Sequence, residues 1–326
     1  MTEYFFRLGP DTILSALDQS GFTTTGEIYP LNSYENRVYE VRLEEPLVSQ
    51  QSSVVAKFYR PGRWSLAALI DEHQFLQELH NEGVPVNCPL KIDGPLRTQC
   101  PTIGEIAGIF FAVCTKHRGR IPDEFLHDEH AQVGRLLAQI HNVGARSRAQ
   151  HRPAYDAHYV GQALEHIENY IPSHLWNPYL DAAEWLLNAY EQVFARKPII
   201  RIHGDCHRGN LLKNEDGFFF VDFDDFCNGP VEQDFWMLFA AQGEESEREL
   251  DLLLGGYCEL RASPPPKRSD LELLRGLRII HYSGWVGKRW RDPSFPRLIP
   301  DYPTVSYWAD ELRTLEQIIQ RLHGNP

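Results

Sequence analysis

The sequence lacks any apolar run of the roughly 20 residues that a membrane-spanning helix needs, and its first residues lack a signal-peptide core. Its six cysteines form no CxxC pair and no zinc-ligand spacing, so we expect reduced thiols and neither disulfides nor structural zinc. Basic residues are also few, because 32 Lys plus Arg stand against 45 Asp plus Glu, a formal charge of −13. Nonspecific nucleic-acid binding needs a basic surface. The sequence therefore predicts a cytoplasmic protein with neither membrane nor nucleic-acid partners.

No internal repeat is present, and a content of 42% hydrophobic and 24% charged residues is ordinary for a globular enzyme. A chain of 326 residues has room for about two domains, each with its own core. Short β-patterned runs dominate upstream of a polar segment, TKHRG, and helical periodicity dominates downstream. We expect an N-terminal region over residues 1–114, a hinge over 115–120 and a C-terminal region over 121–326.

The β-patterned runs predict four strands in the first region, at Glu27–Tyr29, Arg37–Leu43, Val54–Tyr59 and Ile109–Cys114. One helix interrupts them, from an N-cap at Ser65 to a stop at Gly83. Downstream, helices are predicted at Asp128–Val143, Pro178–Ala195, Val231–Gln242, Arg268–Trp290 and Val305–Leu322. The fold class is therefore α+β, with a small antiparallel sheet and one main helix followed by a larger, mostly helical region.

The most informative segment is IHGDCHRGN at residues 202–210, which is followed by a further aspartate twelve residues later. Asp205, Asn210 and Asp222 thereby form the layout with which a phosphoryl-transfer site holds a hydroxyl acceptor and magnesium. The layout predicts an ATP-dependent kinase in which Asp205 and Asp222 are the catalytic carboxylates.

A β-hairpin explains how Asn210 and Asp222 come together. The four-residue turn NEDG predicts that Lys213 faces Phe218. Counting back along both strands places Asn210 opposite Val221 and beside Asp222. Opposed residues of antiparallel strands have Cα atoms about 4.5 to 5.5 Å apart, so the amide oxygen and the carboxylate can reach one cation. Both are hard oxygen ligands, and we expect them to bind Mg²⁺.

Asp205 lies in the loop that leaves a strand expected at Pro198–Ile202. There its carboxylate can orient an acceptor hydroxyl and take its proton, a role worth roughly 10²- to 10⁴-fold in rate. Gly204 and Gly209 allow the backbone turns of this loop. A lone histidine such as His203 more often ties a loop down than takes part in chemistry. We therefore predict that Asp205 is the proton acceptor.

A matching nucleotide site is expected in the first region. The strand VVAKFY at residues 54–59 resembles the one in which protein kinases carry the lysine that contacts the α- and β-phosphates, which makes Lys57 the candidate. In the helix that follows, Glu72 falls on the same face as the apolar stripe. A carboxylate that faces the core needs a counterion, and we expect Lys57 to supply it.

No GxGxxG phosphate loop precedes the lysine strand, which departs from the ordinary protein-kinase pattern. The turn NSYEN at residues 32–36 is the one available to cover phosphates, and Ser33 with nearby backbone amides is our candidate for binding phosphate oxygens. From spacing alone, an ordinary hairpin turn explains the segment nearly as well. Asp224, Asp225 and Glu232 form an acidic rim that could attract a cationic acceptor, although solvated loop carboxylates are the commoner explanation.

These residues carry a family resemblance. The pattern HGDxHxxN at residues 203–210 with the later Asp222 resembles the aminoglycoside phosphotransferase and choline kinase superfamily, a kinase-like fold with HGD in place of HRD. Within this superfamily, six further segments resemble the serine/threonine protein kinases of the bacterial stress response. They are Pro30–Val38, Lys57–Pro61, Glu72–Phe75, Asn228–Pro230, Asp234–Leu238 and Arg289–Pro296. This resemblance spans most of the chain.

The resemblance implies a two-lobed, protein-kinase-like fold and a monomeric, cytoplasmic serine/threonine protein kinase that uses ATP and Mg²⁺. In such folds an aspartate at the place of Asp234 braces the catalytic loop. Carried over by position, the resemblance implies that Asp205 is the proton acceptor and that Asn210 and Asp222 are the magnesium ligands. It also implies that Ser33 and Lys57 contact the nucleotide.

The residues leave other functional classes open. A small-molecule hydroxyl kinase of the aminoglycoside, choline or homoserine type shares the ATP machinery of a protein kinase, so the motif does not separate the two. A metallohydrolase is suggested by HxDxH at residues 203–207, although only His281 and His323 follow His207. A pseudokinase normally lacks the lysine or a motif carboxylate, and here all are present. Nothing in the chain names the phosphate acceptor.

Overall fold

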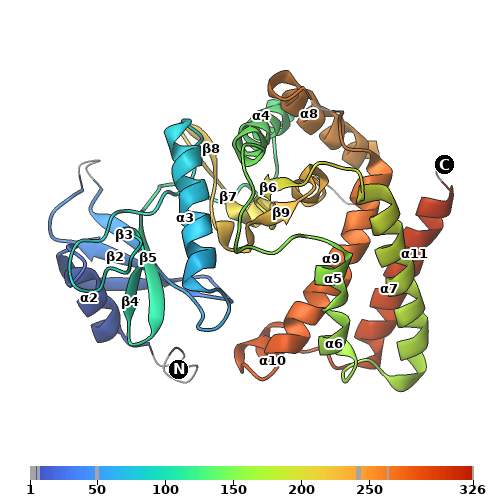
Figure 1. Ribbon diagram of the computed structural model, residues 1–326, viewed down its shortest axis with the longest axis horizontal. Helices are drawn as coiled ribbons and strands as arrows, with labels where there is room; N and C mark the ends of the chain where they lie inside the picture. The colour runs from blue at the N-terminus through green and yellow to red at the C-terminus, as the bar shows by residue number, and fades with distance from the viewer. Residues whose placement is uncertain (1–4, 6–7, 48–50, 240–243, 263, 325–326) are drawn as a thin grey trace. The chain divides into compact units, whose positions relative to one another are not determined.

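The computed structural model describes residues 5, 8–47, 51–239, 244–262 and 264–324 (Figure 1). The chain divides into two compact units. Unit 1 extends to Asp123 and also includes Ala149–Arg152 and Gly209–Asp224, and unit 2 comprises Glu124–Arg148, Pro153–Arg208 and the chain from Asp225 onward. The sequence assigned the segment with Asn210 and Asp222 to the second region, whereas the structure places it in unit 1. The lobe boundaries at residues 114 and 120 stay predictions.

Unit 1 is built on a five-stranded antiparallel sheet with the order β1-β2-β3-β5-β4. The strands are β1 (Thr24–Leu31), β2 (Arg37–Leu43), β3 (Ser53–Phe58), β4 (Gly104–Ile106) and β5 (Ile109–Thr115). The four predicted strands are therefore confirmed to within a few residues at each end. The short β4 was not predicted, because three residues are too few to show an alternating pattern.

Two helices cover the two faces of this sheet. Val54, Ala56 and Phe58 of β3 share a buried cluster with residues of α2 (Pro10–Asp18). The alternate residues of β3 point to the other face, which puts Lys57 on the side of α3 (Leu66–Asn81). Figure 1 shows α3 lying alongside β5 and β3. A lysine in this strand and a carboxylate on this helix are therefore presented to each other.

The start and the end of α3 follow from local chemistry. The Ser65 hydroxyl accepts a hydrogen bond from the Ala68 backbone N–H at 3.2 Å, as the N-cap prediction requires. The helix ends at Asn81, and Gly83 follows with a positive φ of 75°. Glycine enters this left-handed region without a steric penalty, so it stops the helix. The predicted helix is confirmed at both ends.

The motif hairpin of unit 1 has the predicted register. Strands β7 (Leu211–Asn214) and β8 (Gly217–Phe220) pair antiparallel with Lys213 opposite Phe218. Beyond the ladder, the Val221 N–H donates to the Asn210 carbonyl oxygen at 2.9 Å, which continues the pairing by one step. The turn chemistry alone was enough to fix this alignment.

Unit 2 is mostly helical, as predicted. Its helices are α4 (His127–Gly144), α5 (Ala157–Gly161), α6 (Leu164–Ile167), α7 (Ser173–Phe194), α8 (Glu244–Leu260), α9 (Arg268–Arg289), α10 (Ser294–Leu298) and α11 (Val305–Gly324). A short antiparallel ladder joins β6 (Ile200–Ile202) to β9 (Cys227–Gly229). In the described ranges, no helix has the length and apolar character that crossing a bilayer requires.

Helices α7, α9 and α11 pack against one another and form the main core of unit 2 (Figure 1). The fully buried Trp308 packs there between two fully buried tyrosines. Its ring centroid lies 5.8 Å from that of Tyr179 and 5.0 Å from that of Tyr302. Close aromatic contacts of this kind stabilise the fold by more than the burial of their apolar surface alone. These buried aromatic side chains serve helix packing.

Helices α4 and α8 approach closely because two glycines lie between them. A Cβ on Gly134 would lie 2.0 Å from the Leu253 carbonyl oxygen, and one on Gly256 would lie 2.0 Å from the Ala131 carbonyl oxygen. Helix α8 was not predicted, since its glycines and its many charges weaken the periodic signal. The glycines that obscured the helix are the residues that let it pack.

The helix predicted at Val231–Gln242 is wrong over the described residues. Val231–Asp234 forms one 3₁₀ turn, and no α-helix continues to residue 239; residues 240–242 lie outside the described ranges. The apolar spacing is real, because Phe235 and Leu238 are buried. Asp234, however, is hydrogen-bonded to another loop rather than placed on a helix face. Tertiary contacts have overridden the local pattern.

Candidate active site

Lys57 of unit 1 is surrounded by three carboxylates. Its Nζ lies 2.9 Å from Asp222 Oδ1, 3.1 Å from Asp224 Oδ1 and 4.0 Å from Glu72 Oε1. The expected ion pair with Glu72 is present, but it is the longest of the three. Asp224 was expected at the surface with the acidic rim, whereas it is buried and 3% exposed. That expectation is wrong because two cations of unit 1, Lys57 and Arg63, neutralise the Asp224 carboxylate in the interior.

The closest partner of Glu72 is Arg152, a residue that the sequence did not single out. Its Nη2 donates to Glu72, its Nε donates to the Ala68 carbonyl oxygen at 2.9 Å, and its Nη1 donates to the Asp224 carbonyl oxygen at 2.8 Å. The guanidinium also lies 4.1 Å from the centroid of the Trp64 ring. Arg152 stands 80 positions after Glu72 in an irregular segment, so no periodic pattern could reveal it.

Lys57 stays charged despite its burial. Burial lowers the pKa of Lys57, but Asp222, Asp224 and Glu72 together hold that pKa well above the ordinary lysine value. Burial raises the pKa of Glu72 to about 7, against the opposing effects of Lys57 and Arg152. Lys57 is therefore cationic at neutral pH and is held at several points. Such a lysine is prepared to meet an anionic ligand.

Arg152→Gln should destabilise unit 1 by about 2–3 kcal/mol, since a buried carboxylate loses its closest cation while Lys57 still partly compensates. The free energy of unfolding from a denaturant titration measures the loss. Arg118→Gln, which changes an arginine of unit 1 that is exposed, is the control. A variant as stable as the parent protein would show that Arg152 does not support Glu72.

The turn at residues 32–36 is anchored on both sides. The Asn36 N–H donates to the Ser33 hydroxyl at 3.3 Å, and the Asn36 side chain accepts from the Arg60 N–H at 3.1 Å. Glu35, which is 8% exposed, is paired with Arg60 at 3.2 Å and with Arg63 at 3.8 Å. Ser33 thus shapes the turn through its hydroxyl. Its nucleotide contact stays a prediction.

Asn210 and Asp222 are the two residues that the sequence predicts as ligands of a divalent cation. Asn210 is 9% exposed, and Asp222 has a side chain that is 49% exposed and a backbone φ of 59°. Few residues other than glycine adopt this left-handed conformation, and those that do often belong to functional sites. One amide and one carboxylate oxygen fit Mg²⁺, which keeps most of its waters. Among the described residues, no three His, Cys, Asp or Glu side chains gather as metal ligands.

The loop that carries Asp205 in unit 2 is braced by Asp234. The backbone N–H groups of His203 and Gly204 donate to the two Asp234 carboxylate oxygens, each at 2.8 Å. Asp234 is fully buried, and His141 Nε2 lies 3.1 Å from its Oδ2. This confirms the bracing role expected for Asp234. His203 accepts a hydrogen bond from the Asp205 N–H on its Nδ1 at 3.3 Å, which fits its expected structural role.

Gly204 is required at its position. Its φ is +83°, and a Cβ would lie 2.2 Å from the Asp225 carbonyl oxygen. Any other residue would both strain the backbone and displace the chain around Asp225. The prediction that this glycine permits the turn before Asp205 is therefore confirmed.

Asp205 lies beside an arginine and a histidine of unit 2. Arg278 of α9 donates from Nη2 to Asp205 Oδ1 at 2.5 Å, and His207 Nε2 lies 3.4 Å from Oδ2. Burial alone would raise the pKa of Asp205, but Arg278, His207 and His203 hold that pKa below the ordinary aspartate range. The carboxylate is thus ionised and oriented. Sequence reasoning missed Arg278, which lies 73 positions further along the chain.

Glu232 does not belong to a solvated acidic rim. It is 7% exposed and accepts a hydrogen bond from Lys197 Nζ at 2.5 Å. Lys197 also donates to Asp270 near the start of α9. The expectation of surface exposure is wrong here because a lysine distant in sequence neutralises two buried carboxylates.

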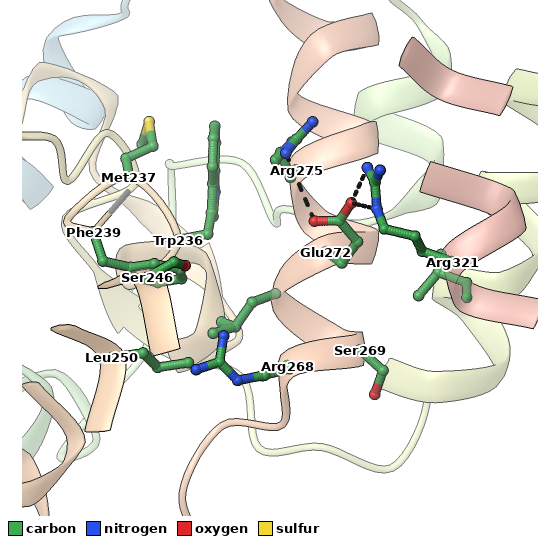
Figure 2. Close-up of a pocket in the computed structure, with 12 residues that line it drawn as sticks. Trp236, Met237, Phe239, Ser246, Leu250, Arg268, Ser269, Glu272, Arg275 and Arg321 are labelled. Carbon is green, nitrogen blue, oxygen red and sulfur yellow. Dashed lines mark hydrogen bonds and ion pairs between the residues drawn. The ribbon is translucent and has the colours of Figure 1, made fainter. Parts of the chain in front are cut away.

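A separate pocket of about 500 Å³ lies in unit 2 among α8, α9 and α11 (Figure 2). Glu272 joins two arginines along its wall, with Arg321 Nε at 2.7 Å and Arg275 Nη1 at 3.8 Å, and Trp236 and Leu250 add apolar surface. The pocket contains none of the residues predicted to bind nucleotide, metal or acceptor. It is therefore not part of the candidate active site.

The sequence is similar to those of several known proteins. The profile described as the phosphotransferase enzyme family matches residues 27–269. Stress response kinase A of Escherichia coli K12 is 35% identical over 99% of this chain and 96% of its own length. A Salmonella typhimurium protein described as serine/threonine protein kinase RdoA is 34% identical over the same shares.

Among solved structures, an amicoumacin kinase in complex with AMP-PNP, Ca²⁺ and Ami is similar in fold. It has a TM-score of 0.76 and 18% identity, and the match covers 99% of this chain and 96% of the other. At that identity the similarity shows the fold alone. It confirms the kinase-like α+β fold class that the sequence predicted.

Proposed function

Because the chain belongs to the phosphotransferase enzyme family, we propose that it is an ATP- and Mg²⁺-dependent kinase that phosphorylates serine or threonine hydroxyls of proteins. Kinase activity follows from the family and from full-length relatives that are named as kinases. The preference for a protein acceptor is supported by the relative described as a serine/threonine protein kinase. The observation that carries the nucleotide site is the anchoring of Lys57 by Asp222, Asp224 and Glu72.

In this proposal, unit 1 binds the nucleotide. Lys57 contacts the α- and β-phosphates, Glu72 keeps the lysine in place, and Ser33 contacts phosphate oxygens from the turn. Asn210 and Asp222 hold Mg²⁺, which when bound neutralises the charge that develops on the phosphate oxygens. Lys57 is cationic before ATP binds, so its positive charge is available to the phosphates as they arrive.

Unit 2 supplies the acceptor chemistry. Asp205 orients the acceptor hydroxyl and takes its proton as the oxygen attacks the γ-phosphorus. The brace from Asp234 to the backbone of His203 and Gly204 keeps this loop in one conformation. We propose that the protein acts as a monomer in the cytoplasm.

The second candidate function is a small-molecule hydroxyl kinase. It is supported by the similar fold of a protein described as an amicoumacin kinase, which was solved in complex with AMP-PNP, Ca²⁺ and Ami. Both functions use the same ATP machinery, so the acceptor must be identified directly. Incubation with γ-labelled ATP and Mg²⁺, followed by mass spectrometry, would locate any phosphoserine or phosphothreonine. Rapid labelling of an amino alcohol or aminoglycoside with no labelled protein would favour the second function.

Lys57→Met should weaken ATP binding about tenfold, since a charge-assisted contact with the phosphates is lost. The fold should survive, because Arg152 still pairs with Glu72 and Arg63 still pairs with Asp224. Calorimetric titration with ATP and Mg²⁺ measures the affinity. Lys91→Met, which removes an exposed lysine paired with Asp93 at 3.3 Å, is the matched control and should bind ATP normally. Unchanged affinity in Lys57→Met would remove this lysine from the nucleotide site.

A further inference from the structure

Arg278 donates a short hydrogen bond to the carboxylate that we assign as proton acceptor. It lies on α9, and its Nη2 donates to Asp205 Oδ1 at 2.5 Å. The side chains of both residues are 18% exposed. An ion pair that is mostly withdrawn from water is screened less than a surface pair, so its geometry restrains the carboxylate.

The guanidinium of Arg278 is itself held from other sides. Its Nη1 lies 3.4 Å from Nδ1 of His281, and the His281 ring lies 5.1 Å from the ring of Tyr159. Burial and the nearby arginine lower the pKa of His281 to about 3, so this imidazole is neutral and can accept a hydrogen bond. Asp225 adds a further negative charge that favours the charged form of Arg278. Arg278 is therefore a fixed cation rather than a mobile one.

The two oxygens of Asp205 are not equivalent. Arg278 engages Oδ1, whereas Oδ2 faces His207, whose side chain is 41% exposed and belongs to the same loop. Holding one oxygen of a carboxylate against a fixed donor fixes its rotation about χ2 and so directs the other oxygen. Oδ2 is thereby the oxygen on the side of the exposed His207 ring.

We propose that Arg278 is a positioning residue for phosphoryl transfer, which holds Asp205 Oδ1 so that Oδ2 receives the proton of the acceptor hydroxyl. This inference rests on the proposed function. In the step concerned, the acceptor oxygen forms a bond to the γ-phosphorus as the bond from that phosphorus to the bridging oxygen breaks. The hydroxyl proton passes to Oδ2, and the electron pair of the broken bond leaves with ADP.

The test compares Arg278→Gln and Arg278→Lys with the parent protein. Phosphoryl transfer from labelled ATP is measured with myelin basic protein as the acceptor and, separately, with water. Arg278→Gln should lower kcat about tenfold to thirtyfold, because misplacing a catalytic group by less than an ångström is costly. The KM for ATP should stay within about twofold, since Arg278 belongs to unit 2 and we assign nucleotide binding to unit 1. Arg278→Lys keeps the charge and should recover a several-fold part of the loss.

The pH profile gives a readout that a merely structural role would not move. The groups that lower the pKa of Asp205 are Arg278, His207 and His203. Removing Arg278 takes away the largest of these effects and raises that pKa. Activity requires ionised Asp205, so the acidic limb of kcat should move to higher pH in Arg278→Gln. Arg278→Lys should move it less.

A matched control is available elsewhere in unit 2. Arg135 makes a two-point contact with Glu259 at 2.6 and 3.2 Å on the exposed side of α4, and Arg135→Gln should leave both kcat and the pH profile unchanged. Equal activity of Arg278→Gln and the parent, with an unmoved acidic limb, would overturn the positioning role and leave the kinase function standing. A loss without any rescue by lysine, matched by an equal loss of folded protein, would also overturn it. A parent protein that binds ATP but transfers phosphate to no acceptor would overturn both.

Discussion

Asp205→Asn should transfer phosphate at least about a hundredfold more slowly than the parent protein while binding ATP and Mg²⁺ with nearly the same affinity. The amide has the shape of the carboxylate but cannot take a proton from the acceptor hydroxyl. It also loses the charge that Arg278 and His207 engage. Single-turnover measurements with labelled ATP give the rate of transfer, and calorimetry gives the nucleotide affinity.

The control for this variant is an aspartate of unit 2 outside the catalytic loop. Asp251 is exposed on α8, and Asp251→Asn should leave the rate of transfer unchanged. The assignment of Asp205 would fail if its asparagine variant kept more than about a tenth of the parental rate, since a lost general base has a larger effect. Loss of ATP binding together with activity would indicate a disturbed fold instead.

Asp234→Ala should lower the free energy of unfolding by about 3–5 kcal/mol. The substitution leaves the backbone N–H groups of His203 and Gly204 without their acceptor in a fully buried environment. It also leaves the Nε2 group of His141, which lies 3.1 Å from Asp234 Oδ2, without this partner. Chemical denaturation followed by circular dichroism measures the change. Transfer should fall as well, because the loop before Asp205 loses its brace.

Asp234→Asn separates the charge from the shape of the side chain. An amide accepts through one atom only, so one of the two backbone N–H groups would face an NH₂ group and repel it. We expect a loss of stability only modestly smaller than that of the alanine variant. Asp251→Asn, which removes an exposed carboxylate, should stay within about 0.5 kcal/mol of the parent. An Asp234→Ala variant with parental stability would show that the loop does not depend on this carboxylate.

The parts of the fold that the sequence predicted well are those determined by neighbours along the chain. Ser65 begins α3 and Gly83 follows its end because capping and positive φ are local properties. The turn before Gly217 aligned β7 with β8 because turn chemistry sets the register of a hairpin. The short β4 and the glycine-interrupted α8 were not predicted, since the hydrophobic pattern of β4 is too brief and that of α8 is too weak.

The candidate site was predicted unevenly for the same reason. The sequence predicts the ion pair between Lys57 and Glu72, because Lys57 lies in a recognisable strand and Glu72 lies on the apolar face of the helix that follows. The sequence did not show that Arg152 is the closest partner of Glu72, or that Arg278 binds Asp205. Both arginines come from segments far along the chain. Nothing in the sequence around them distinguishes them from the other arginines, because their carboxylate partners become neighbours only in the folded protein.

The sequence by itself determined which residue types are available for phosphoryl transfer and how the nearby ones are spaced. Spacing of this kind reflects short-range sterics and the period of a helix or a strand. Tertiary structure alone decided how the charges are balanced, including the burial of Asp224 and Glu232 and the identity of the arginines. The reason is that a buried charge must be neutralised by whichever group folding brings within reach, and no periodicity along the chain records that choice.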